Sequence, residues 1–599
     1  MAALVTWILI RKHIRLTMSV IGGLCKASKS ELMGAVVLGL YALFIFSLAV
    51  RIVPYNWDSL SYHLSRIWFW AQNESVTHFA TMDTRMLGTP GFTEFIDLHL
   101  YLLYVQSNDA VLNLTQSFSY ILNIIFVYSI ARRIGVDNFG RIYAVLLFAA
   151  SPIVFAESLS TQTDEFAALW ILAFSRVVLE IAYSDDGLCL DKKGIGRLLV
   201  LAMSLALSIL TKPSGLFCVA ALFVWLLYMC LKRKDNIRLI FTWIALVTVI
   251  MVVIILPEAI RNIVTYGAMT DPWQGPGQLV LTIDLRYQFI NFFKNIGFFL
   301  PGVLWPSFNN IWQHLVYYLG YILHIDIDSS LISEGGNYQD NLLGKVENYE
   351  YDTATNSVIT ILFLGILLIT VIRCIIYSVR KIVRSDKKEL SCPISFGYSS
   401  AAFLAFIITC AFVKSEVFVC RYMIASFGLL APAICLQIQK LGKYKNRLFE
   451  GLIYGASGLL ICAQLFNMII VHLEHKYSGD DRAEAYYEVN GGEYGSVYEP
   501  LSRYLEENAQ EYHSIGIKMD SNTYVYPVLR LLEEYSDTVY YIDVPNSSSK
   551  YSDDEYQPDC IIVITYSDMG NMYDKDYNYN GLSYVQDEQL SGRCRVFVR

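Results

Sequence analysis

Long apolar runs are the feature that most constrains the fold of this chain. Segments of about 20 mostly apolar residues, long enough to cross a bilayer as helices, recur between residues 33 and 471. Charged residues make up only 17% of the sequence, against about 25% in a soluble protein. We therefore predict a polytopic α-helical membrane protein with about 11 spans: 33–53, 109–131, 142–158, 165–183, 197–211, 214–231, 238–257, 356–377, 396–413, 422–439 and 449–471.

Basic residues gather in alternate short loops between these spans. The stretches 132–141, 192–197, 232–238, 380–388 and 440–447 are rich in Lys and Arg, and the short loops opposite them are poor in both. Cytoplasmic loops carry such an excess of Lys and Arg. We therefore expect a cytoplasmic N-terminal segment, 1–32, and a transmembrane domain, 33–471. The loops 54–108 (the first loop) and 258–355 and the tail 472–599 are then extracytoplasmic.

The tail has the pattern of a small soluble α/β domain. It is acidic, and its apolar runs are short and separated by polar clusters. A helix is predicted over Glu499–Tyr512. Strands are predicted over Ser514–Lys518, Thr538–Val544, Cys560–Thr565 and Arg593–Val598. Because no catalytic constellation stands out in it, we interpret the tail as an accessory domain.

Charge and cysteine content argue against two broad classes of function. The net charge of -8 is not that of a chain with a global polycationic character, so we expect no nucleic-acid partner. Most of the 12 Cys lie inside apolar segments, where they behave as small hydrophobic residues. The sequence has no CxxC pair or His/Cys cluster typical of zinc or haem.

The first loop carries polar residues directly after the first predicted span. Asp58 is at the membrane surface between water and apolar walls, an environment that can raise a carboxylate pKa toward the range of a general base. In a helix, His63 and Arg66 would follow it one and two turns on, and Arg66 could bind a phosphate. An amphipathic juxtamembrane helix anchored by tryptophans such as Trp57 explains the same pattern equally well.

Further charges lie at the outward ends of other helices. Asp164 and Glu165 begin the fourth span, Lys212 occupies a tight outward turn, and Arg421 and Tyr422 begin the tenth. Helix-dipole complementation and snorkelling are the structural alternatives for these charges.

The middles of the predicted spans are almost free of charge. Arg261 follows the seventh span, and Lys414 and Glu416 precede the tenth, so these residues too lie near outward ends. A transporter places its charges near the bilayer midplane. The pattern favours an enzyme that acts at the membrane surface on an anionic, membrane-embedded substrate.

Several of these motifs resemble bacterial GT-C glycosyltransferases, the relatives of protein O-mannosyltransferases and of the lipid A aminoarabinose transferase. The resemblance covers most of 33–440 and not the tail. It rests on Trp57 to Arg66, Trp70 to Phe79, Pro90 to Phe95, Leu98 to Leu100, Ser160 to Glu165, Thr211 to Gly215, Arg261 to Ile263, Tyr266-Gly267 and Arg421-Tyr422.

The resemblance implies a multi-pass enzyme of the bacterial plasma membrane with an outward-facing site. Such enzymes use a polyprenyl-phosphate sugar as donor and usually invert the anomeric carbon. The acceptor would be a cell-envelope lipid, polysaccharide or protein. Asp58 would be the general base, Glu94 would match a further family acid, and Asp164 with Glu165 would organise the site or a divalent cation.

The resemblance also assigns residues to the lipid phosphate. Lys212, Arg261 and Arg421 are its candidate ligands, with His63, Arg66 and Tyr422 as further substrate-binding residues. The family's usual Asp-Glu pair is Asp58-Ser59 here, which weakens the case for a metal bridged by Asp58 and Asp164. The alternatives are a transporter or flippase of lipid-linked saccharides, and a non-catalytic scaffold that presents the tail to cell-wall partners.

Overall fold

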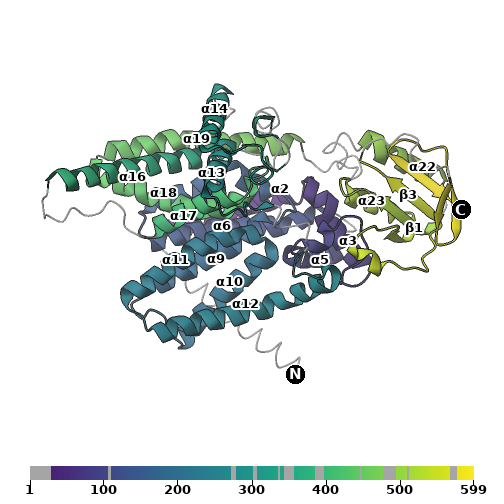
Figure 1. Ribbon diagram of the computed structural model, residues 1–599, viewed down its shortest axis with the longest axis horizontal. Helices are drawn as coiled ribbons and strands as arrows, with labels where there is room; N and C mark the ends of the chain where they lie inside the picture. The colour runs from purple at the N-terminus through teal and green to yellow at the C-terminus, as the bar shows by residue number, and fades with distance from the viewer. Residues whose placement is uncertain are drawn as a thin grey trace.

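A helical bundle and a sheet domain lie at opposite ends of the long axis of the computed structural model, with α3 (Leu64–Gln72) and α5 (Phe92–Tyr104) between them (Figure 1). The structure describes residues 29–104, 109–270, 278–300, 306–334, 337–340, 342, 356–384, 397–445, 447–475, 494–508, 512–566 and 576–599. The predicted N-terminal segment therefore lies almost entirely outside the described residues.

A helix is present at each predicted span. These helices are α2 (Lys29–Ala49), α6 (Leu114–Arg133), α7 (Asn138–Ala149) with α8 (Pro152–Glu157), α9 (Asp164–Ala182), α10 (Lys192–Thr211), α11 (Leu216–Arg233), α12 (Ile237–Tyr266), α16 (Ser357–Arg384), α17 (Tyr398–Phe412), α18 (Ile424–Lys445) and α19 (Arg447–His475). Within the described residues, 7 helices are long and apolar enough to cross a membrane. The span count of about 11 stays a prediction.

The third predicted span is not one continuous helix. It divides into α7 and α8 at Ser151, directly before Pro152. Proline has no backbone N–H to donate and disfavours the helical conformation of the residue before it. Pro152 therefore begins the second helix, a position that proline tolerates.

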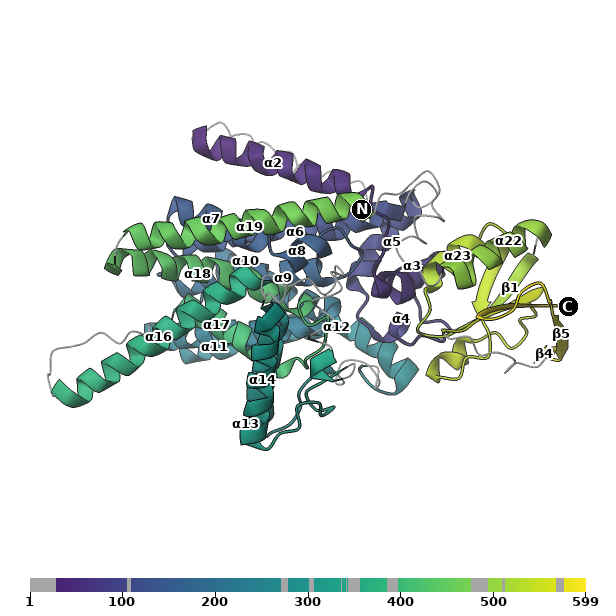
Figure 2. The same ribbon diagram turned by 90° about the horizontal axis from the view of Figure 1, so that it is seen from above.

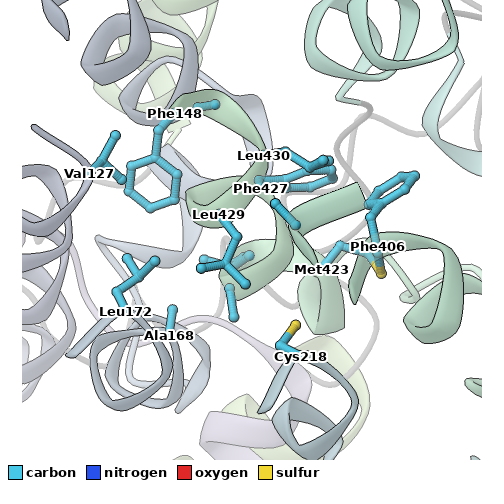
Figure 3. Packing of buried hydrophobic residues seen from close by; sticks show 14 of the residues in the cluster. Val127, Phe148, Ala168, Leu172, Cys218, Phe406, Met423, Phe427, Leu429 and Leu430 are labelled. Carbon is cyan, nitrogen blue, oxygen red and sulfur yellow. The ribbon is translucent and has the colours of Figure 1, made fainter. Parts of the chain in front are cut away.

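The bundle is built around α18. In its apolar window 78% of the residues are buried, against 11% for α12. Phe427, Leu429 and Leu430 of α18 lie among side chains of neighbouring helices (Figure 3). A Cβ at Gly428 would come 2.9 Å from the Leu172 side chain of α9, so glycine permits the close approach of these helices. The low burial of α12 is that of a peripheral helix.

A helical hairpin from the second loop projects from the bundle (Figure 2). It comprises α13 (Leu285–Phe299) and α14 (Pro306–Leu323). Asn291 and Asn295 of α13 donate hydrogen bonds to the carbonyl oxygens of Cys410 and Val413 at the end of α17. These bonds satisfy carbonyls that the end of a helix leaves without partners.

The C-terminal domain is a six-stranded mixed sheet in the order β2-β1-β3-β6-β5-β4. Strands β2, β1 and β3 are parallel, and β6, β5 and β4 continue the sheet antiparallel. The strands are β1 (Tyr512–Met519), β2 (Ser536–Tyr541), β3 (Cys560–Ile564), β4 (Asp576–Tyr579), β5 (Leu582–Gln586) and β6 (Cys594–Val598), with helices α22 (Glu499–Asn508) and α23 (Val525–Leu532). All four predicted strands are present, whereas α23, β4 and β5 were not predicted.

The C-terminal domain shares one hydrophobic cluster with the first loop. Ile67 and Phe69 of α3 are buried in the same cluster as Val525 and Leu529 of α23. Trp68 Nε1 also donates a hydrogen bond to Glu533 Oε2 at 2.7 Å. The domain therefore packs directly on the loop that contains the predicted catalytic residues.

Candidate functional site

Asp58 lies where the first loop, the start of α9 and the start of α18 converge. It directly precedes a π-helical turn, Ser59–His63, which leads into α3. Arg421 Nη1 donates a hydrogen bond to Asp58 Oδ2 at 2.8 Å, and Arg85 Nη1 lies 4.0 Å from Asp58 Oδ1. Gln162 Nε2 lies 3.5 Å from Oδ2. The Asp58 side chain remains 20% exposed, so a ligand can reach it.

The electrostatic environment of Asp58 differs from the expected one. Burial raises the pKa of Asp58, but the positive charges of Arg421, His63 and Arg85 outweigh burial and lower the pKa to about 2. The prediction of a raised pKa at Asp58 is therefore wrong for the protein without substrate. Arg421, the first of these basic partners, lies 363 residues further along the chain, so the sequence did not reveal its contact with Asp58.

A second ion pair adjoins the first through the short 3-10 helix Arg421–Met423. Lys212 Nζ donates to Asp164 Oδ1 at 2.6 Å and lies 4.4 Å from the centroid of the Tyr422 ring. Lys212 is 19% exposed and Asp164 is 2% exposed. In the part of the chain that the structure describes, the other Asp164 oxygen, Oδ2, is buried without a hydrogen-bond partner. The ion pairs Asp58–Arg421 and Asp164–Lys212, together with Arg85, form a group that we call the open cluster.

The sequence assigned no role to Arg85, which belongs to the open cluster, or to Glu416, which borders it. Arg85 begins the short helix α4 (Arg85–Gly88), and its guanidinium is bound by both oxygens of Asp83. Glu416 is hydrogen-bonded to Tyr422; burial and then Glu334 raise its pKa to about 7 despite Arg421 and Lys212 nearby. The presence of both residues in outward segments was the only signal in the sequence.

His63, Arg66 and Glu94 form a second charged group, the sealed network. Arg66 Nη1 and His63 Nδ1 lie 3.0 Å and 2.6 Å from Glu94 Oε1. Other Arg66 nitrogens donate to backbone carbonyls of residues 85–89. Arg66 and Glu94 are each 1% exposed. The structure therefore places these predicted site residues inside the fold of the first loop, where they hold α3, α4 and α5 together.

Glu165 and Arg261 lie apart from the open cluster. Glu165 is fully buried, and its Oε2 accepts a hydrogen bond from Asn123 of α6 at 2.7 Å. The Arg261 guanidinium lies 5.9 Å from the Trp70 ring and 5.7 Å from the Phe95 ring. Of the predicted residues, the structure thus brings together Asp58, Asp164, Lys212, Arg421 and Tyr422.

The open cluster does not have the donor set of a divalent-cation site. Asp58 and Asp164 are each neutralised by a basic side chain, Arg421 and Lys212. Among the described residues there is no group of three or more His, Cys, Asp and Glu placed to hold a metal ion. Mg²⁺ or Mn²⁺ would need oxygen ligands that carry no competing cation. We therefore derive no chemical step through a metal.

The arrangement is suited to an anionic group. Arg85, Lys212 and Arg421 reach one region from three separate segments, and the side chains of Arg85 and Lys212 are 21% and 19% exposed. Arginine and lysine are the usual protein ligands of phosphate oxygens. A carboxylate beside them, Asp58, is available to accept a proton.

Residues 89–260 match the family model of dolichyl-phosphate-mannose-protein mannosyltransferases. The matched segment contains Asp164 and Lys212 of the open cluster and Glu94 of the sealed network. Asp58 and Arg421 lie outside it. No curated protein sequence matches the chain significantly.

Three solved structures of two proteins have a distant similarity to the chain. Apo ArnT from Cupriavidus metallidurans is 14% identical, with a TM-score of 0.47, over 95% of this chain and 98% of ArnT. ArnT bound to undecaprenyl phosphate is 13% identical, with a TM-score of 0.44, over 94% and 97%. An oligosaccharyltransferase from Archaeoglobus fulgidus, in complex with Zn and sulfate, is 12% identical, with a TM-score of 0.46, over 88% and 68%.

The family match covers two of the five residues of the open cluster, Asp164 and Lys212, within a chain of apolar helices and a C-terminal sheet domain. It agrees with the resemblance carried by the sequence motifs. Over residues 89–260, the chain is therefore similar to dolichyl-phosphate-mannose-protein mannosyltransferases.

Proposed function

We propose that this glycosyltransferase moves a sugar from a polyprenyl-phosphate donor to an acceptor hydroxyl on the extracytoplasmic face, with inversion at the anomeric carbon. The observation that carries the proposal is the contact between Asp58 and Arg421. It brings a carboxylate and a guanidinium side by side, and the carboxylate is 20% exposed. This reaction requires both groups at the same anomeric centre.

The donor phosphate is bound by the cations of the open cluster. When the bond between the anomeric carbon and the phosphate oxygen breaks, its electron pair goes to that oxygen and negative charge develops there. Arg421, Lys212 and Arg85 stabilise this charge, because preorganised cations in a partly dehydrated site are effective at the developing anion. Tyr422 supports the ammonium group of Lys212 through its ring.

Donor binding also activates Asp58. With a pKa of about 2, Asp58 is ionised but is a weak base toward a hydroxyl. A phosphate that draws Arg421 toward itself removes the main counter-charge of Asp58, so the pKa of this carboxyl rises. Asp58 then takes the proton of the acceptor hydroxyl while the acceptor oxygen forms its bond to the anomeric carbon. The donor therefore binds before the acceptor reacts.

Two features support an extracytoplasmic site. The charges of the short loops favour an extracytoplasmic position for the first loop and the tail. The tail also contacts the open cluster, since Arg85 Nη2 donates to the Ser521 carbonyl at 2.6 Å. The acceptor is then a lipid, polysaccharide or protein of the cell envelope, and the membrane is the bacterial plasma membrane.

Cysteine labelling in intact cells tests this orientation. A membrane-impermeant maleimide is expected to label Asp554→Cys in the tail and not Lys193→Cys in a basic loop, both of which are exposed positions. Labelling only after cell lysis at residue 554 would place the tail and the site in the cytoplasm.

The reaction is tested with purified full-length protein in proteoliposomes supplied with labelled polyprenyl-phosphate sugars and a cell-envelope fraction. We expect free polyprenyl phosphate and a glycosylated acceptor whose anomeric configuration, measured by NMR, is opposite to that of the donor. Intact donor that appears in the opposite leaflet without cleavage would contradict the proposal and indicate a flippase.

A further inference from the structure

The parallel strands β1 and β3 of the C-terminal sheet have their carboxyl ends toward the open cluster. The connection from β1 leads to β2 on one side, and the chain then crosses to β3 on the other side of β1. Strands β1 and β3 are thus neighbours whose connections run in opposite directions. In open α/β sheets, ligands bind outside the carboxyl ends of the strands at such a switch point.

The residues that follow β1 and β3 face the first loop. Ser521 and Tyr524 follow β1, and Tyr566 follows β3. The carbonyl of Ser521 accepts the hydrogen bond from Arg85, and the Tyr524 ring lies 4.8 Å from the Trp57 ring. Trp57 directly precedes Asp58, so the carboxyl ends of β1 and β3 adjoin the proposed base.

Trp57, Tyr524 and Tyr566 form an aromatic cluster beside Asp58. The Trp57 and Tyr566 rings are 6.4 Å apart and inclined by 76°. Tyr566 is held in place by its backbone N–H, which donates to Asp520 at 2.9 Å, and the Arg593 guanidinium lies 5.9 Å from its ring. Tyr566 nevertheless stays 56% exposed, so its ring is accessible to a ligand.

The side chains at the carboxyl ends of β1 and β3 are suited to binding a saccharide. The C–H faces of sugar rings stack on aromatic rings, and the exposed Ser521 offers a polar group for sugar hydroxyls. Arg593 instead donates to the Thr565 carbonyl and to Ser496. A peptide that added a strand to the sheet would need the free edge of β2. There the Gln72 side chain already pairs with the Val539 backbone, through hydrogen bonds of 2.8 Å and 2.9 Å.

We propose that Trp57, Tyr524 and Tyr566 form an acceptor subsite for a saccharide, and that the C-terminal domain thereby selects a glycan acceptor. This inference rests on the proposed glycosyl transfer and names its acceptor class. It gives the C-terminal domain a direct part in the reaction, because a sugar on Tyr566 lies on the Asp58 side of the sheet domain.

The subsite is tested by saturation-transfer difference NMR on the full-length protein in nanodiscs. The probes are chitotriose, maltotriose and cellotriose, each measured without donor. We expect saturation of ring C–H protons of at least one probe with the wild type, and about tenfold weaker binding with Tyr566→Ala. Tyr566→Phe is expected to bind like the wild type, because the ring and not the hydroxyl makes the contact. Val585→Ala, which alters an exposed apolar residue on β5, is the matched control.

Binding without donor separates this inference from the proposed function. No saturation of any probe, or equal binding by wild type and Tyr566→Ala, overturns the subsite even if the wild type cleaves the donor. Binding of a serine- and threonine-containing peptide that depends on Tyr566, with no saccharide bound, overturns the saccharide assignment. Saccharide binding that depends on Tyr566, with no donor cleavage, would instead overturn the proposed transfer alone.

Discussion

The first loop contributes charged residues to two groups, the sealed network and the open cluster, that look alike in sequence and differ in structure. In the sealed network, Arg66 and Glu94 are each 1% exposed and bind each other or the backbone of the same loop. In the open cluster, Asp58 is 20% exposed and its partner Arg421 comes from the far end of the transmembrane domain. A buried ion pair fixes a structure, whereas a partly exposed one between distant segments can exchange a partner for a ligand.

The sealed network and the open cluster have different roles although they contain similar residues. The sealed network joins α3, α4 and α5, so it holds Arg85 and Asp58 in position without reaching a substrate. The open cluster is available to a phosphate and a hydroxyl. Variants in the two groups should therefore separate folding from catalysis.

The largest effect is expected for Asp58→Asn. Loss of the base lowers kcat by about 10³-fold, within the usual range for a general base, and leaves the thermal stability of the purified protein close to that of the wild type. Glu94→Gln should do the reverse. It leaves the Arg66 charge without its partner, at a cost of about 3–5 kcal/mol, and the activity per folded molecule stays within about threefold.

Donor turnover and thermal denaturation, measured on the same preparations, check this pair of variants. A Glu94→Gln protein that is stable but inactive would place the sealed network in the reaction. An Asp58→Asn protein with full activity would remove Asp58 as the base.

The second largest effect concerns donor affinity. Arg421→Ala and Lys212→Ala each remove a charge-assisted hydrogen bond worth about 1.5–3 kcal/mol, so we expect the donor KM to rise about 10- to 100-fold. Arg261→Ala is the matched comparison, because Arg261 lies over Trp70 and Phe95 and outside the open cluster. A larger KM increase for Arg261→Ala than for the other two would show that the phosphate binds on the Trp70 side.

A smaller effect is expected from Glu416 and pH. Burial and Glu334 raise the pKa of Glu416 to about 7, so the carboxyl is neutral below that pH and negative above it. Arg421, Lys212 and Tyr422 face the same carboxyl. A negative charge there repels the donor phosphate, so the donor KM should rise a few-fold as pH increases through about 7. In Glu416→Gln this rise should be absent; a rise of unchanged size would mean that another group titrates.

The smallest effect is expected from metal removal. Arg421 and Lys212 already neutralise Asp58 and Asp164. Treatment with EDTA should therefore change the initial rate of donor cleavage by less than about twofold. A loss of activity that Mn²⁺ or Mg²⁺ restores would show that a cation displaces these basic side chains in the working enzyme.

The sequence predicted the helices and four of the five residues of the open cluster for clear physical reasons. A membrane helix needs about 20 apolar residues, and such runs are visible without knowledge of the fold. Asp58, Asp164, Lys212 and Arg421 stood out because charges are costly near a membrane and collect at helix ends.

The contacts between these charged residues could not be predicted from the sequence. Asp58 and Arg421 are 363 positions apart, and only the packed bundle brings them together. Arg66 was predicted to bind a phosphate. Helical spacing shows on which face of a helix a side chain lies, but it does not show which group that side chain contacts. The contact of the C-terminal domain with Arg85 likewise depends on docking between distant segments.

The structure of Asp58→Asn with a bound polyprenyl-phosphate sugar tests the central claim most directly. We predict that the phosphate is within hydrogen-bonding distance of Arg421 and Lys212, with the anomeric carbon beside residue 58 and the sealed network unchanged. A phosphate bound at Arg261 or at Arg66, with Lys212 still paired to Asp164 and the open cluster empty, would contradict it.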